Sequence, residues 1–136
     1  MKQKGVQVSA EITEFEAIFA EAREKLEATY DQPDLIPYGA RLVALCQSHP
    51  ELREQFGLAF IRMFFDEARN EVSLIEFAMH VLRWPEVKLA FEALSHYAVS
   101  KNDWRIINPI GHILDAFEDD WENALDFYGN YFKQRT

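Results

Sequence analysis

The chain has 136 residues, a length that favours one domain, and its 49% hydrophobic and 14% aromatic content excludes a disordered or low-complexity chain. Its 14 Lys and Arg against 23 Asp and Glu give a formal net charge of -9. Such a charge repels nucleic acid and anionic membrane surfaces, and it favours a basic protein as partner. Solubility of a lone domain is the alternative interpretation of the same charge.

A loose arm and two helices are predicted at the start of the chain. Residues 1–9 are polar and unpatterned, and they are expected to form the arm. Over residues 11–30 apolar side chains recur at three- and four-residue steps, which indicates one helix that ends before Pro33. A second helix is expected over residues 37–47.

The next two helices are predicted to begin at capping boxes, in which two side chains satisfy unpaired backbone N–H groups. Ser48 and Glu51 have this spacing and would open a helix that continues to about residue 68. That helix is apolar nearly all round, so we expect it at the centre of the fold. Ser73 and Glu76 repeat the spacing and would open a fourth helix, which ends at about Arg83.

Proline residues mark the starts of two further helices, because Pro is favoured in the first turn of a helix. Trp84 and Pro85 separate the fourth helix from a fifth. Asn108 and Pro109 are expected to cap and open a sixth, after a turn or helical entry at residues 103–105.

The last helix is predicted from Asp119 and Glu122 to about Phe132, because carboxylates favour a helix start. The chain thus contains six or seven predicted helices and no convincing alternation of strand type. A single all-α domain over residues 1–136 is the predicted fold class.

An internal comparison bears on the architecture of this domain. Sliding residues 84–94 by 37 positions pairs Trp84 with Trp121 and aligns further apolar positions. Two-helix repeats of the HEAT or armadillo kind have a period of about 40 to 47 residues. The helices are therefore expected to form either a short HEAT-like stack of helical hairpins or an irregular helical bundle.

Three histidines, His80, His96 and His112, recur 16 residues apart, and Glu76 and Glu92 each lie four residues before a histidine. A pair at this spacing shares one helical face and offers two metal ligands. We favour two solvated polar faces instead, because the Glu-x-x-His and His-Glu-x-x-His motifs are both missing. No metal site is predicted, and a small helical metal-binding enzyme stays as the weaker alternative.

Catalytic motifs are also missing. Cys46, the single cysteine, allows no intramolecular disulfide, and its apolar surroundings predict a buried thiol without an orienting partner. The five glycines form no nucleophile elbow, phosphate-binding loop or dinucleotide fingerprint. The sequence therefore predicts no catalytic residue, no cofactor and no enzyme. Residues 1–20 lack a secretory core and no run suits a membrane span, so a cytoplasmic location is expected.

The stretch over residues 103–132 combines aromatic residues with one sign of charge. It holds two of the three tryptophans, and no Lys or Arg lies between Arg105 and Lys133. An aromatic centre with a charged rim is the composition of a protein-binding hot spot. The alternative is a terminal helix whose rings cap the core while its acids face water. The candidate partner-binding residues are Asp115, Glu118, Asp119, Asp120, Trp121, Glu122, Asp126 and Tyr128.

The local segment Asp-Asp-Trp-Glu-Asn at residues 119–123 precedes a Phe-Tyr pair at 127–128. With its small size, acidity and helical pattern, the chain resembles the acidic all-helical immunity proteins that bacteria pair with contact-dependent and other polymorphic toxins. The resemblance implies binding to a toxin domain, often a basic nuclease, whose functional surface is covered. It also implies that acidic residues meet the toxin's basic groups while Trp and Tyr supply desolvated anchors. A HEAT-like scaffold or adaptor for another protein partner is the alternative function.

Overall fold

The computed structural model of the chain describes residues 9–126, 128, 129 and 131. The predicted arm lies outside these residues except for Ser9. The all-α fold class is confirmed, since the described residues form helices and no strand. The helices are α1 (Ala10–Thr29), η2 (Gln32–Leu35), α2 (Ile36–Ser48), η3 (Pro50–Leu52), α3 (Arg53–Phe64), α4 (Val72–Leu82), α5 (Pro85–Ser100), α6 (Trp104–Asp115) and α7 (Glu122–Asp126).

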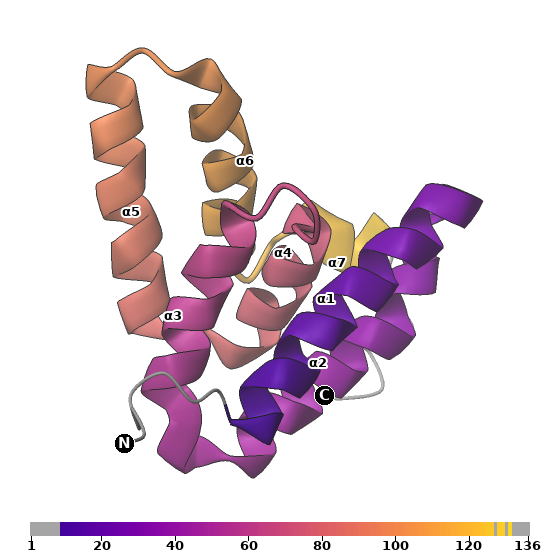
Figure 1. Cartoon of the computed structure of the whole chain (residues 1–136). Helices are drawn as coiled ribbons and strands as arrows, with labels where there is room; N and C mark the ends of the chain where they lie inside the picture. Colours follow the sequence, from indigo (N-terminus) through magenta and orange to yellow (C-terminus); the bar gives the residue numbers. More distant parts are fainter. Residues whose placement is uncertain (1–8, 127, 130, 132–136) are drawn as a thin grey trace, which may run out of the picture.

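The long helices pack in two layers, as the ribbon in Figure 1 shows. In one layer α1 packs on α3 and α3 on α5, while in the other α2 packs on α4 and α4 on α6. Helix α1 also pairs with α2, and α5 pairs with α6. With a less extensive contact between α3 and α4, this order of packing is that of three stacked helical hairpins, the first of the two predicted architectures.

The C-terminal segment folds back on α4 and does not extend the stack. The Trp121 ring lies 4.9 Å from the His80 ring, and the Tyr128 ring lies 5.1 Å from that of Phe77. The predicted match of residues 84–94 with 121–131 is therefore not a structural repeat. It arises because both segments carry apolar residues at helical spacing, which any two amphipathic helices share.

Helix starts differ from the predicted capping boxes. Ser9 caps α1, where its hydroxyl accepts a hydrogen bond from the Ile12 N–H at 3.1 Å. Both predicted boxes are wrong, because Ser48 is the last residue of α2 and Ser73 lies inside α4. The prediction for Pro109 is also wrong, since this residue lies within α6, which begins five residues earlier.

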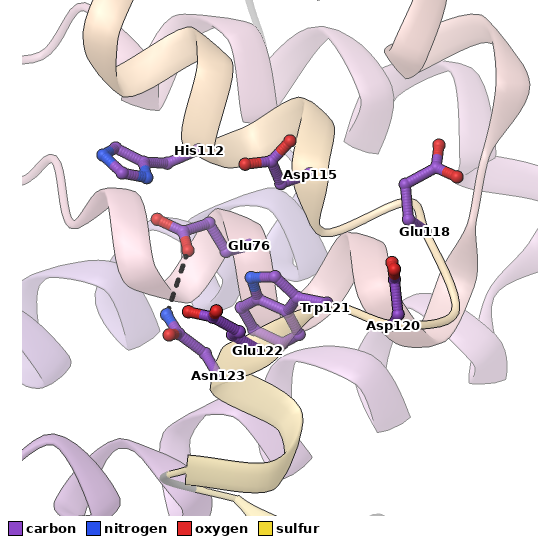
Figure 2. Close-up of a pocket in the computed structure, with 8 residues that line it drawn as sticks. All are labelled: Glu76, His112, Asp115, Glu118, Asp120, Trp121, Glu122 and Asn123. Atoms are coloured by element: carbon purple, nitrogen blue, oxygen red, sulfur yellow. Dashed lines mark hydrogen bonds between the residues drawn. The ribbon is translucent and has the colours of Figure 1, made fainter.

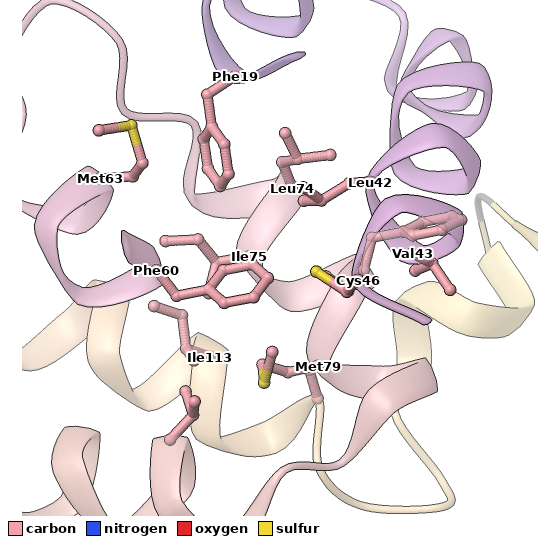
Figure 3. Packing of buried hydrophobic residues seen from close by; sticks show 14 of the residues in the cluster. Phe19, Leu42, Val43, Cys46, Phe60, Met63, Leu74, Ile75, Met79 and Ile113 are labelled. Atoms are coloured by element: carbon pink, nitrogen blue, oxygen red, sulfur yellow. The ribbon is translucent and has the colours of Figure 1, made fainter. Parts of the chain in front are cut away.

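The core is centred on α4, whose six residues from Leu74 to Met79 are all buried. Helix α3, which was predicted at the centre of the fold, lies between α1 and α5, and it exposes 63% of Leu58 while Phe65, just after its last residue, is 49% exposed. Figure 3 shows that the α4 side chains are surrounded by residues of four other helices. These neighbours are Phe19 of α1, Leu42, Val43 and Cys46 of α2, Phe60 and Met63 of α3, and Ile113 of α6.

Cys46 is buried, as predicted, and burial raises the pKa of its thiol to about 12. A thiol with so high a pKa is almost entirely protonated at neutral pH and is a poor nucleophile. None of the described helices combines the length and the apolarity needed to cross a bilayer.

Candidate functional site

A hollow of about 380 Å³ lies beside the buried face of α4, next to the end of α6 and the start of α7. Figure 2 shows its lining, in which the carboxylate of the buried Glu76 lies between Asp115 and His112 on one side and Glu122 and Asn123 on the other. The lining residues are Glu76, His112, Asp115, Glu118, Asp120, Trp121, Glu122 and Asn123. We call this site the acidic hollow.

Two contacts hold the segment after α6 against α4 and so shape the acidic hollow. The backbone carbonyl of Ala116 lies 2.8 Å from Nδ1 of His80. Since a carbonyl only accepts hydrogen bonds, Nδ1 carries the proton, and burial lowers the pKa of His80 so that the ring is neutral at pH 7. Arg83 donates to Asp119 at 2.8 Å, which anchors the same segment from the end of α4.

Glu76 is the unusual group of the hollow because it is only 7% exposed. Asn123 donates one long hydrogen bond of 3.5 Å to its Oε1. Burial, followed by the negative charges of Glu71 and Asp115, raises the pKa of Glu76 to about 7. At neutral pH this carboxyl therefore exists in both protonation states.

The acids at the rim are largely uncompensated. Asp115, Asp120 and Glu122 are exposed and form no ion pair with any residue that the structure describes. Glu118 has Lys88 at 4.0 Å. Most arginines are engaged elsewhere, in the ion pairs Arg23–Glu27, Arg41–Glu14, Arg41–Glu21, Arg53–Glu86, Arg62–Glu16, Arg69–Glu16 and Arg69–Asp66.

The structure does not bring all the predicted partner-binding residues together. Asp115, Glu118, Asp120 and Glu122 come together at the acidic hollow, with Trp121 as part of its wall. Asp119 is outside this lining and is paired with Arg83, which holds the pKa of its carboxyl below the ordinary value. The side chain of the remaining acid, residue 126, lies outside the described residues.

The prediction that Trp121 and Tyr128 are surface anchors is corrected by their burial. Trp121 is 6% exposed and Tyr128 is 1% exposed, because both rings pack on α4. The Tyr128 hydroxyl also accepts a hydrogen bond from Gln32 at 2.9 Å. Of the two rings, only Trp121 contributes to the lining of the hollow.

Sequence analysis missed Glu76, His112 and Asn123 as members of the site. The prediction that Glu76 and His80 lie on a solvated face of their helix is wrong, since the segment after α6 covers that face. A signal was present in the sequence, because Glu76 is flanked on both sides by apolar residues of the run 74–79. A carboxylate within such a run is a candidate buried acid.

The chemistry available at the acidic hollow is cation binding and proton exchange. A carboxyl with a pKa near 7 exchanges a proton at neutral pH, and carboxylates around it attract ammonium and guanidinium groups. Its lining, as far as the structure describes it, holds no serine, threonine or cysteine. Across the described part of the chain, no three His, Cys, Asp or Glu side chains come together as a metal site requires.

Comparison of the chain with protein-family models, with curated proteins and with solved structures found no match. The fold by itself does not specify a function, since helical stacks serve many. The function is therefore inferred from the chemistry of the hollow.

Proposed function

We propose that the protein is a non-catalytic binding protein, and specifically an immunity protein that neutralises a basic toxin domain by covering its functional surface. The observation that carries the proposal is the acidic hollow, in which rim acids without a described ion pair surround the buried carboxyl of Glu76. In the absence of a partner this arrangement concentrates negative charge around a desolvated carboxyl.

The hollow suits one long basic side chain of the partner. Its volume of about 380 Å³ accommodates the stem and head group of an arginine or lysine. The head group would reach Glu76, while Asp115 and Asp120 at the rim would approach neighbouring basic residues. A cation near Glu76 favours its ionised form, so the hydrogen bonds it forms are charge-assisted and strong.

The exposed acids at the rim and the buried Glu76 have different roles in this proposal. Exposed acids mainly accelerate encounter with a basic surface and make it sensitive to salt. The buried carboxyl acts after contact, because it meets a cation of the partner once a basic group enters the hollow. A toxin that binds an anionic substrate through basic residues would lose access to that substrate once these residues are engaged.

A scaffold or adaptor function is the second candidate, and the packing of the helices as three stacked hairpins favours it. Such a protein would also bind a partner through an exposed surface. The two functions differ in what the partner does alone, since a toxin domain harms the cell that makes it and a scaffold client does not.

The test is an affinity capture from lysate of the native organism, at low and high salt. The bait is the wild-type chain or the double variant Asp115→Lys with Asp120→Lys, which reverses two charges at the rim. The matched control reverses two exposed acids away from the hollow, Glu24→Lys with Asp31→Lys, so the net charge is the same in both variants.

A basic protein that binds the wild type and the control, is released by salt, and fails to bind the Asp115 and Asp120 variant supports the proposal. Expression of that captured protein alone then distinguishes the two functions. Growth arrest that co-expression of the present chain relieves supports immunity. Equal capture by all three baits means that the partner binds elsewhere on the surface.

A further inference from the structure

A second surface lies on the other layer of the stack, where α3 and α5 run side by side (Figure 1). Arg53 at the start of α3 donates two hydrogen bonds to Glu86 at the start of α5. Further along, the rings of Phe64 and Phe91 lie 5.5 Å apart. The two helices therefore run in the same direction, and their outward faces form one continuous surface.

Both outward faces begin with a glutamate, which apolar residues follow at three- and four-residue steps. The residues are Glu54, Leu58, Ile61 and Phe65 on one face, and Glu86, Leu89, Ala93 and Tyr97 on the other. The exposed large apolar side chains of this surface are Leu58 at 63%, Phe65 at 49%, Leu89 at 65% and Tyr97 at 63%. Single exposed apolar residues are ordinary, but several on two adjacent helices mark an interaction surface.

A groove of about 170 Å³ runs between the two helices, and we call it the α3–α5 groove. Its lining is apolar apart from two carboxylates, and consists of Glu54, Gly57, Leu58, Ile61, Glu86, Val87 and Ala90. The groove is smaller than the roughly 300 Å³ at which pockets for organic ligands begin, but it accommodates an apolar side chain. Size and lining thus favour a protein segment as its occupant.

We propose that the α3–α5 groove binds the apolar face of an amphipathic helix with a basic end. Helices dock in this way when they insert residues spaced at i, i+3 or i+4 into an apolar groove. Glu54 and Glu86 both line the groove at the end where the two helices begin; Arg53 already engages Glu86, whereas Glu54 forms no ion pair with a described residue. The basic end of the docked helix would lie over Glu54.

Charge also decides between a basic partner and a second copy of this chain. A second copy has the same net charge of -9, so two copies repel each other at long range. A basic amphipathic helix is attracted by the same field. The proposal goes beyond the immunity function, because it concerns another surface and holds whichever protein binds the acidic hollow.

The probe for the test is a synthetic amphipathic peptide with leucines at i, i+3, i+4 and i+7 and lysines at one end. Its binding is measured by fluorescence anisotropy and located by amide chemical shifts in NMR spectra of the full chain. On addition of the peptide, the amide chemical shifts of residues 54–65 and 86–97 are expected to change. A matched peptide with glutamates in place of the lysines is expected to bind at least about threefold more weakly.

Three variants examine the surface formed by α3 and α5; Gly57 and Leu58 line the groove, and Leu89 is an exposed residue outside its lining. Leu58→Ser and Leu89→Ser change exposed side chains, and each is expected to weaken peptide binding about tenfold. Gly57→Ala places a methyl group 3.5 Å from Val87, an ordinary contact, so the chain still folds while the groove is narrowed and binding weakens. Val99→Ser is the control, because Val99 is 60% exposed but two residues beyond Tyr97 and thus on another side of α5.

Three results would overturn the proposal. Equal peptide affinity of wild type, Leu58→Ser and Leu89→Ser would mean that the groove does not bind the peptide. Changes in amide chemical shift confined to residues 112–124 would show that the peptide binds at the acidic hollow alone. A dimer seen in sedimentation without peptide, and dissociated by Leu58→Ser, would assign the surface to a second copy.

Discussion

Replacement of Glu76 by glutamine examines the most unusual group of the structure. The substitution keeps the size and shape of the side chain and removes its charge. The Glu76 carboxyl is 7% exposed, and the acids Glu71 and Asp115 add repulsion to the cost of burying it. His112 and Glu122 also line the hollow around it.

The size of the effect follows from the pKa of Glu76, which rises from 4.5 to about 7 on folding. At about 1.4 kcal/mol for each pKa unit, this rise corresponds to roughly 3 kcal/mol of unfolding free energy. Between pH 4.5 and about 7 the folded protein holds a proton that the unfolded chain has released. The unfolding free energy of the wild type therefore falls as pH rises through this window and levels off above it.

The assay is urea unfolding followed by circular dichroism at several pH values from 4 to 8. The free-energy difference between Glu76→Gln and wild type is expected to grow by about 3 kcal/mol in favour of the variant over this range. Glu122→Gln is the control, since it removes one charge at the rim and leaves the buried carboxyl in place. Parallel pH curves for wild type and Glu76→Gln would refute the inference that Glu76 is desolvated.

Further predictions concern the backbone. In Gly39→Ala the new Cβ would overlap the Phe77 ring, so the free energy of unfolding measured in urea should fall by about 1–3 kcal/mol. Gly111→Ala is the matched change in another helix, where the new Cβ meets nothing within 4 Å, so the free energy of unfolding should rise by about 0.5–1 kcal/mol. Equal effects of the two substitutions would contradict the packing described here. Tyr30 ends α1 with φ 54° and is 88% exposed, so Tyr30→Gly should raise the melting temperature by removing up to about 1 kcal/mol of strain. A lower melting temperature would instead mean that the exposed ring stabilises the fold.

The helical pattern of the sequence was sufficient to predict the fold class and the approximate extents of most helices. Periodicity predicted α1 and α2 to within a residue or two of their observed bounds, because one face of each is strictly apolar. Helix starts were predicted less well. The spacing of Ser48 and Glu51 fits a capping box, but the tertiary fold continues α2 through Ser48 and begins η3 at Pro50.

The site could be predicted only in part, since it depends on contacts between segments far apart in the chain. Clustering of acids over residues 115–122 was visible in the sequence, and four of them line the hollow. The burial of Glu76 was not visible, because it depends on the segment after α6 folding back over α4. The same fold-back buries Trp121 and Tyr128, whose periodicity fitted a core position and a surface anchor equally well.

The affinity of the captured basic partner for the purified chain tests the central claim most directly. Titration calorimetry at two salt concentrations would compare the wild type, the variant Asp115→Lys with Asp120→Lys, and the control Glu24→Lys with Asp31→Lys. We expect the hollow variant to bind at least about tenfold more weakly than the control, and with a smaller dependence on salt. Equal affinities for the hollow variant and the control would contradict the assignment of partner binding to the acidic hollow.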